Sequence, residues 1–271
     1  MSMINFLSQF DDDTLEQEAK DTLLSRKEVF GKMTKVSKML AVSALPLGFF
    51  SALSVPAKAQ STNELIDVLN FALTLEYLEN EYYIMGTGQS GLIPSGKDRD
   101  IFVQIQKHEQ QHVDFLIDTI GSLGGTPVEK PTFDFTVGGA FDPFNVYAQF
   151  TALAQAFEDT GVRAYKGQAP VVQGNAAILT AALQIHSVEA RHASEVRRLR
   201  GLKGWITRDN RGTGMPEATQ ATYNGEDIDT QLGIDVRTVT SIGRDAITEA
   251  WDEPLTKQAV LDIASLFIVS D

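Results

Sequence analysis

The chain contains no cysteine, and its lysines and arginines form no long runs. The absence of cysteine excludes disulfides, thiolate zinc sites, iron–sulfur clusters and cysteine nucleophiles. The formal net charge is -13, which argues against a nucleic-acid partner because neutralising phosphates requires a basic face. Neither a G-x-S-x-G motif nor a Walker loop occurs, so serine hydrolase chemistry and a P-loop nucleotide site are unsupported.

The chain does have enough apolar material for a sizeable core. It has 271 residues, of which 43% are hydrophobic, and this suffices for one domain with extensions. Changes in composition predict a leader over residues 1–59, a helical domain over residues 60–200 and an extension over residues 201–271. Glycine, threonine and aspartate become more frequent in the extension.

The leader has the layout of a secretory signal. Acidic and polar residues precede a basic stretch, an uncharged run over residues 39–56, and then Ala57-Lys58-Ala59. This order predicts export with cleavage near Ala59, which gives a periplasmic or secreted protein. The alternative is an uncleaved membrane anchor formed by residues 39–56, although 18 residues fall short of the roughly 20 that a spanning helix needs.

The basic stretch also resembles a particular type of signal. It begins Ser25-Arg26-Lys27-Glu28-Val29-Phe30, which is similar to a twin-arginine signal with lysine in place of the second arginine. The resemblance implies that the twin-arginine export machinery is a partner. The protein would then leave the cytoplasm already folded, with its metal loaded beforehand.

Hydrophobic spacing predicts four helices in the helical domain. They are expected at about residues 61–85, 98–120, 142–165 and 175–200. Asp142 and Pro143 are the expected cap and first-turn residue of the third helix, and Asn175 is the expected cap of the fourth. The core candidates of the first two helices are Leu65, Leu69, Ala72, Ile101, Ile105, Phe115 and Leu116.

The links between these helices are short, long and short. The long link contains an alternating segment, residues 132–137, that can pair as a strand. Together the lengths predict an all-α, ferritin-like antiparallel four-helix bundle with a long crossover between helices two and three. The C-terminal extension is expected to contain a short helix over residues 255–267, and to act as a packing arm or as a subunit contact in a homodimer.

One pattern occurs twice in the helical domain. It consists of a Glu, a Tyr seven residues later, and a Glu-x-x-His pair whose Glu follows the first by 33 residues in one copy and 31 in the other. The two copies are Glu76, Tyr83, Glu109, His112 and Glu158, Tyr165, Glu189, His192. Two lone glutamates and two Glu-x-x-His pairs on inward helix faces are the ligands of a two-metal carboxylate centre.

The chemistry of these residue types supports a metal site. Residues three apart share a helix face, so the members of each Glu-x-x-His pair can approach one ion. Four carboxylates neutralise two divalent ions, whereas uncompensated buried carboxylates cost several kcal/mol each. Carboxylate and imidazole ligands suit iron and manganese, and zinc less selectively. We therefore expect two Fe ions (or Mn) per chain.

Each ligand has an expected role in this centre. Glu109 and Glu189 are the expected bridges. The terminal carboxylates and the imidazoles are expected to be Glu76, Glu158, His112 and His192. Tyr83 and Tyr165 are expected to hydrogen-bond a ligand carboxylate or to donate an electron, with plain core packing as the alternative.

Nearby residues compete with these assignments. Glu79 lies three residues after Glu76 and is an alternative ligand, but it lacks the matching spacing to a tyrosine. His108 and His186 are expected at the surface or the core edge. Asp159 and Arg163 are expected to form an exposed pair. The run over residues 197–200 contains three arginines, which are expected to stabilise a helix C-terminus through its dipole.

Short stretches around these residues resemble the ferritin-like superfamily, and most of all its bacterial exported branch, which is related to the plant desiccation-related proteins. The stretches are Leu75-Glu76-Tyr77-Leu78-Glu79, His108-Glu109-Gln110-Gln111-His112, Ala156-Phe157-Glu158-Asp159 and Glu189-Ala190-Arg191-His192. In the tail, Gly214-Met215-Pro216 and the segment 251–256 are also similar to that branch. The resemblance implies a bundle with a di-iron or di-manganese centre at the six residues above.

Two hypotheses of function follow. In the first, the centre oxidises Fe(II) or consumes oxygen or peroxide in oxidative stress defence, as a ferroxidase or a peroxidase or catalase-like enzyme. In the second, the protein is a non-enzymatic envelope stress or structural protein whose metal is structural or absent.

Overall fold

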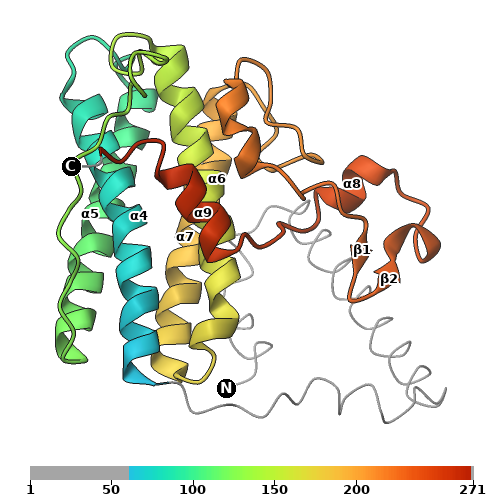
Figure 1. The fold of residues 1–271 in the computed structure, drawn as a ribbon. Coiled ribbons are helices and arrows are strands. Elements are labelled where there is room, and N and C mark those ends of the chain that lie inside the picture. The colour runs from blue at the N-terminus through green and yellow to red at the C-terminus, as the bar shows by residue number, and fades with distance from the viewer. Residues whose placement is uncertain (1–60, 270–271) are drawn as a thin grey trace, which may run out of the picture. The chain divides into compact units, whose positions relative to one another are not determined.

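A computed structural model describes residues 61–269, so the predictions for the leader lie outside the described residues. Four long helices pack side by side and confirm the all-α bundle (Figure 1). They are α4 (Thr62–Gly88), α5 (Lys97–Ser122), α6 (Tyr147–Val172) and α7 (Ala176–Leu199). The two hairpin pairs are α4 with α5 and α6 with α7, and α4 packs on α6. Within residues 61–269, no helix combines the length and the apolar character that crossing a membrane requires.

Local capping explains where two of these helices begin. The hydroxyl of Ser61 accepts a hydrogen bond from the backbone of Glu64, and the carboxylate of Glu64 accepts one from the backbone of Ser61. This reciprocal capping box satisfies amide groups that a helix start leaves unpaired. Asn175 caps α7 as expected, because its side-chain oxygen accepts from the amide of Ile178 at 3.1 Å.

The third helix differs from the prediction at both ends. It begins at Tyr147 with Val146 as its cap residue, because Asp142 binds the side chain of Asn145 instead of capping a helix. The helix then continues past Tyr165 to Val172 and includes Pro170. A proline lacks one backbone donor, but here it falls in the last turn, where little helix remains to be distorted.

The long link between α5 and α6 runs beside the C-terminal end of the described chain. The expected strand over residues 132–137 is reduced to one bridge, between Phe133 and Ile268. Two backbone hydrogen bonds hold it: Asp134 donates to Phe267 at 2.8 Å, and Val269 donates to Thr132 at 2.9 Å.

The C-terminal extension consists of short elements. These are η2 (Glu217–Thr222), β1 (Thr230–Gln231), β2 (Ile234–Asp235), η3 (Val236–Thr238), α8 (Arg244–Thr248) and α9 (Lys257–Ala264). The helix α9 confirms the short helix expected in this region, and it packs against α6 and α4. Val260, Ile263 and Phe267 are buried in the same core cluster as residues of α4 and α6, so the extension completes the bundle core.

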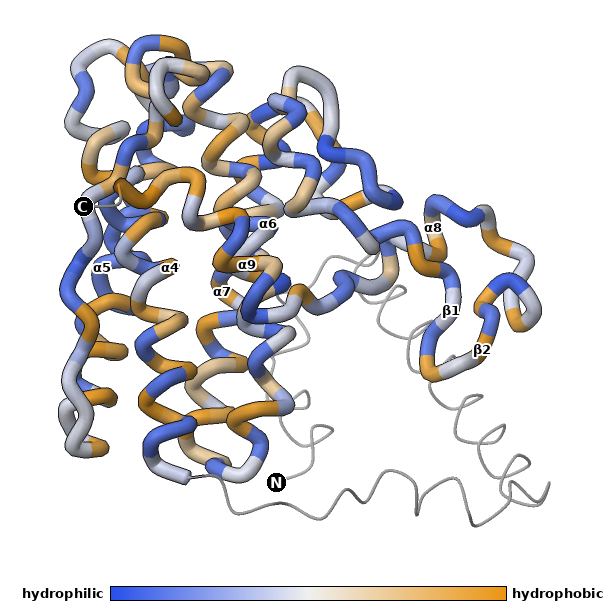
Figure 2. Tube along the Cα trace, viewed as in Figure 1, coloured by the Kyte–Doolittle hydropathy of each residue, from blue (hydrophilic) through white to orange (hydrophobic). Residues whose placement is uncertain are grey.

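The core has two parts along the bundle axis. Aromatic rings dominate one part, which includes Tyr82, Tyr83, Phe102 and Phe150, whereas aliphatic side chains dominate the other. Figure 2 shows apolar and polar residues alternating along the bundle helices, as expected for helices with one buried face. Most of the expected core positions are buried, but Phe115 is 43% exposed and is a correction to the prediction.

Glycine allows α4 and α6 to approach closely. A Cβ atom at Gly86 would lie 2.2 Å from the ring of Phe150 on α6. Gly86, Gly88 and Gly91 also have the spacing of a dinucleotide-binding loop. They end a helix here and do not follow a strand, so the context that such a loop needs is missing.

One buried ion pair lies within the bundle and another joins the bundle to the C-terminal extension, and they correct two predictions. Asp159 and Arg163 are both buried and do not form an exposed pair. Asp159 binds Arg197 of α7 at 2.6 Å, and Arg163 binds Glu226 of the extension at 2.7 Å. Arg197 therefore forms a core ion pair, and its role is not limited to the helix dipole.

We predict that Arg163→Met lowers the free energy of unfolding by about 3–5 kcal/mol, because it leaves the buried Glu226 without its partner. Urea denaturation measures the change. Lys203→Met is the matched control, since Lys203 pairs with Glu249 at 2.6 Å but is 58% exposed, and it should cost only about 0–1 kcal/mol. Equal losses in the two variants would contradict the importance of the buried pair.

Candidate metal centre

Six side chains from the four bundle helices converge inside the core. Glu76 comes from α4, Glu158 from α6, and the two Glu-x-x-His pairs come from α5 and α7. All four carboxylates are fully buried. They form two groups with the histidines, in each of which the potential ligand atoms lie within 4.8 Å of one another: Glu76, Glu109, His112, Glu189 and Glu109, Glu158, Glu189, His192.

Two members are common to both groups, namely Glu109 and Glu189. Each group adds one lone glutamate and one histidine to this shared pair. The arrangement thus has the two-fold character of the sequence repeat. Carboxylates that belong to two ligand groups at once are in the position that bridging ligands need in a dinuclear centre.

The imidazole nitrogens point at carboxylate oxygens. The Nδ1 atom of His112 lies 3.0 Å from Glu109, 3.2 Å from Glu76 and 3.2 Å from Glu189. The Nδ1 atom of His192 lies 2.8 Å from Glu109 and 3.3 Å from Glu158. Each histidine therefore faces the inside of the cluster with one ring nitrogen, as a metal ligand would.

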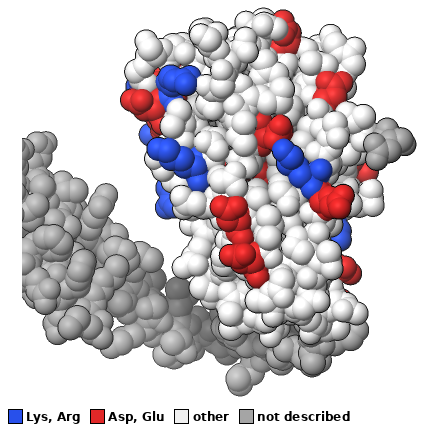
Figure 3. Space-filling model, turned by 90° about the vertical axis from the view of Figure 1, so that its left-hand side faces the viewer, with Lys and Arg blue, Asp and Glu red and all other residues white. Residues whose placement is uncertain are grey.

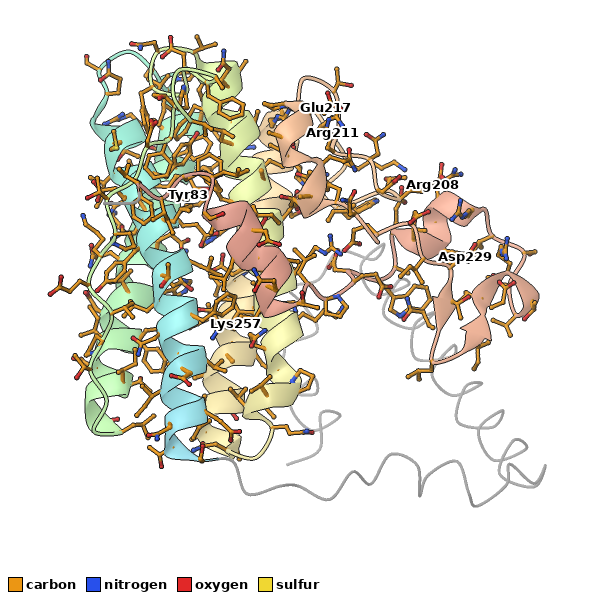
Figure 4. All side chains as sticks on the ribbon, viewed as in Figure 1. Tyr83, Arg208, Arg211, Glu217, Asp229 and Lys257 are labelled. Carbon is orange, nitrogen blue, oxygen red and sulfur yellow. The ribbon has the colours of Figure 1, made fainter. Side chains whose placement is uncertain are left out.

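The two tyrosines of the repeat hold the lone glutamates, and they do so crosswise. Tyr83, near the end of α4 (Figure 4), donates its hydroxyl hydrogen to Glu158 of α6 at 2.5 Å. Tyr165 of α6 donates in the same way to Glu76 of α4. Each tyrosine thus binds the glutamate of the other repeat, and this detail lies beyond what spacing along one helix can predict.

His108 belongs to neither ligand group, but it contacts one of them. Its Nδ1 atom lies 2.9 Å from Nε2 of His192, and its ring stacks on that ring at a centroid distance of 5.1 Å. On its other side, His108 lies 2.7 Å from the side-chain nitrogen of Gln104. A partner at the second ring nitrogen orients a ligating histidine. His186 belongs to neither ligand group.

A fifth carboxylate lies beside the centre. Glu79 is 3% exposed and is absent from both ligand groups, whereas Glu76 belongs to one of them. A Cβ atom at Gly161 would lie 3.1 Å from Glu79 and 3.2 Å from Glu189. The missing side chain at Gly161 therefore gives both carboxylates their space.

Burial and mutual contact shift the acidities of the cluster. Burial raises the pKa of Glu76 to about 7, and it raises the pKa of Glu189 well above its usual value. For Glu109, burial acts in the same direction, but the hydrogen bond from His112 and the close contact with His192 outweigh it and bring the pKa to about 2. Burial alone would lower the pKa of His192, yet the nearby carboxylates of Glu158 and Glu109 raise it to about 11.

The residues fit a pair of divalent ions. Several buried atoms of the cluster have no hydrogen-bond partner among the described residues: Glu109 Oε1, Glu158 Oε2, both carboxylate oxygens of Glu189, and His192 Nδ1. Unpaired buried oxygens are costly unless a cation binds them. The donors are all oxygen and imidazole nitrogen, and the four carboxylates match the charge of two divalent ions.

The comparison with known families agrees with this geometry. A family model for the ferritin-like domain matches residues 64–202, which is just over half of the chain. This range includes all six convergent residues. This chain belongs to the ferritin-like domain family. No curated protein matches the chain. The ferritin-like fold and the buried Glu/His cluster together give a protein whose core can bind metal.

We predict that metal loading of this ferritin-like protein releases protons. Burial opposes protonation of the ligand histidines, but nearby carboxylates outweigh it and raise the pKa of both His112 and His192 above the usual value. The neutral ring that metal binding requires must then form by loss of a proton. Affinity for Mn(II) should therefore rise with pH, by about tenfold per unit for each proton displaced. Calorimetric titration in buffers of different ionisation enthalpy counts those protons, and pH-independent binding would contradict the prediction.

We also predict that His108→Ala lowers the metal affinity about 10- to 100-fold, as loss of the partner of a ligating histidine typically does. His186→Ala is the control, because His186 belongs to neither ligand group and should leave the affinity unchanged. Competition with a metal-sensitive dye measures both. An unchanged affinity in His108→Ala would show that His192 keeps its orientation without this contact.

Proposed function

We propose that this ferritin-like protein holds a dinuclear iron or manganese centre and oxidises Fe(II), or consumes oxygen or peroxide, in stress defence. The observation that carries the proposal is the sharing of Glu109 and Glu189 between two complete ligand groups. In the proposed centre these two residues would hold both ions. Glu76 and Glu158 would each hold one ion as terminal carboxylates, and each histidine would bind one ion.

The choice of metal and the chemistry follow from the donor set. Carboxylate and imidazole ligands suit iron and manganese. When bound, a pair of such ions exchanges electrons with oxygen or peroxide. Fe(II) itself would be the substrate of a ferroxidase reaction.

The chain's own residues provide a rigid and dry environment for this chemistry. Tyr83 and Tyr165 fix the orientation of the lone glutamates by donating hydrogen bonds to them. Full burial of the four carboxylates keeps bulk water away and strengthens electrostatic interactions. The side chain of His112 is 11% exposed, compared with 6% for His192 and 0% for the carboxylates, so His112 is the most accessible member of the cluster.

We predict that Glu109→Ala abolishes binding of both ions and the peroxide or oxygen consumption that depends on them, because it removes one ligand from each group. Elemental analysis and an oxygen-electrode assay measure the two effects. Glu81→Ala is the matched control: Glu81 is also a helix glutamate, but it pairs with Lys130 and belongs to neither group, so metal content and turnover should be retained. Full activity in Glu109→Ala would exclude the proposed centre.

The same measurements separate catalysis from the non-enzymatic alternative. About two metal ions per chain with turnover support the redox function. Metal without turnover would instead support a structural or sequestering role. A folded protein that is isolated from its host without metal would exclude the dinuclear centre and would support the non-enzymatic alternative in which the metal is absent.

We further propose that the protein is exported and belongs to the exported, desiccation-related branch of the ferritin-like proteins. The support is the order of the leader, with its basic stretch, its uncharged run and Ala57-Lys58-Ala59. Sequencing the N-terminus of protein from the periplasm tests the proposal. A mature chain that starts shortly after Ala59 supports it, and an intact leader in a membrane fraction would favour the anchor formed by residues 39–56.

A further inference from the structure

An apolar cavity of about 310 Å³ lies inside the bundle, and side chains of all four long helices line it. It occupies the end of the bundle that holds the start of α4 and α7, which is the lower end in Figure 1. Among the residues that the structure describes, none that lines the cavity carries a charge, and the polar lining side chains are Thr119, Tyr165 and Gln168. The volume is at the lower limit of small-molecule sites, which measure about 300–1,000 Å³.

The cavity reaches the layer of the metal centre. Ala72, Leu116 and Ile185 line it, and each is four positions along its helix from a member of a ligand group, which is about 6 Å along the axis. Tyr165 lines it as well, and its hydroxyl donates to Glu76. These lining residues are therefore about one helical turn from the centre, and Tyr165 contacts both the cavity and Glu76.

The cavity also reaches solvent. Phe115 of α5 and Ala177 of α7 both line it and are both exposed. An entrance therefore lies where α5 faces α7. On the face drawn in Figure 3, Lys, Arg, Asp and Glu gather mainly above the lower end of the bundle, which is largely uncharged.

We propose that this cavity is a binding site for a neutral organic molecule with a hydrocarbon chain, held with its inner end against Tyr165. An apolar cavity of this size is twice the roughly 150 Å³ of an engineered cavity that takes up benzene, and close-packed interiors contain few such spaces. The absence of lining cations argues against a fatty-acid carboxylate or a phosphate. The few polar side chains allow one hydroxyl or carbonyl group on the ligand.

The test measures binding of 1-hexanol, 1-octanol and 1-decanol to the metal-free and to the metal-loaded protein by calorimetry. Affinity should rise about fourfold with each added methylene until the chain fills the cavity. Ala182→Phe places a ring at the cavity wall and should weaken 1-decanol binding at least about tenfold. Ala176→Phe is the control, because Ala176 lies on the same helix but does not line the cavity.

Two results would overturn the proposal: no alcohol binding by the unmodified protein, or equal binding by both variants. If Ala182→Phe does not fold, Ala181→Leu gives a smaller obstruction at another lining position, and unchanged binding there counts against the proposal in the same way. Metal content is measured in every sample. Alcohol binding without metal would leave the cavity assignment standing while the dinuclear centre fails, and metal without alcohol binding would do the reverse.

Discussion

The structure depends on how the charge of four carboxylates, which are buried together inside the helical bundle, is balanced. Like charges in a dry core repel strongly, and water is not there to screen them. Neighbouring groups compensate part of this negative charge. Two imidazoles and two tyrosine hydroxyls point at carboxylate oxygens. Within residues 61–269, the oxygens of Glu189 have no hydrogen-bond partner, so protons or cations are needed to balance the charge of the cluster.

The helix α6 links this cluster to the rest of the protein. It is buried on all sides from residue 150 to residue 165, and its charged residues point in different directions. Glu158 faces the centre, while Asp159 binds Arg197 of α7 and also accepts a hydrogen bond from Tyr223 of the extension at 2.8 Å. The tail thus supports a residue directly adjacent to a potential metal ligand, which is the way that outer contacts orient inner ones.

Local signals predicted most of the architecture, and distant contacts account for the rest. The cap at Asn175, the helical period of the core and the twofold Glu/Tyr/Glu-x-x-His spacing are all properties of short segments. The buried state of Asp159 and Arg163 is different, because their partners are Arg197 of another helix and Glu226 of a segment without periodicity. The crosswise binding of the tyrosines and the contact of His108 with His192 likewise arise only when helices meet. Phe115 is exposed because it lies at the entrance of a cavity, and no pattern in the sequence predicts that cavity.

The place of the last described residues has a consequence for how the chain is made. Val269 donates a hydrogen bond to Thr132, and Phe267 packs into the aromatic core beside Phe157 at a ring distance of 4.9 Å. A ribosome releases these residues long after the four bundle helices have emerged. Part of the bundle interior therefore stays uncovered until the segment around Phe267 has been made and packs against helices that precede it in the sequence.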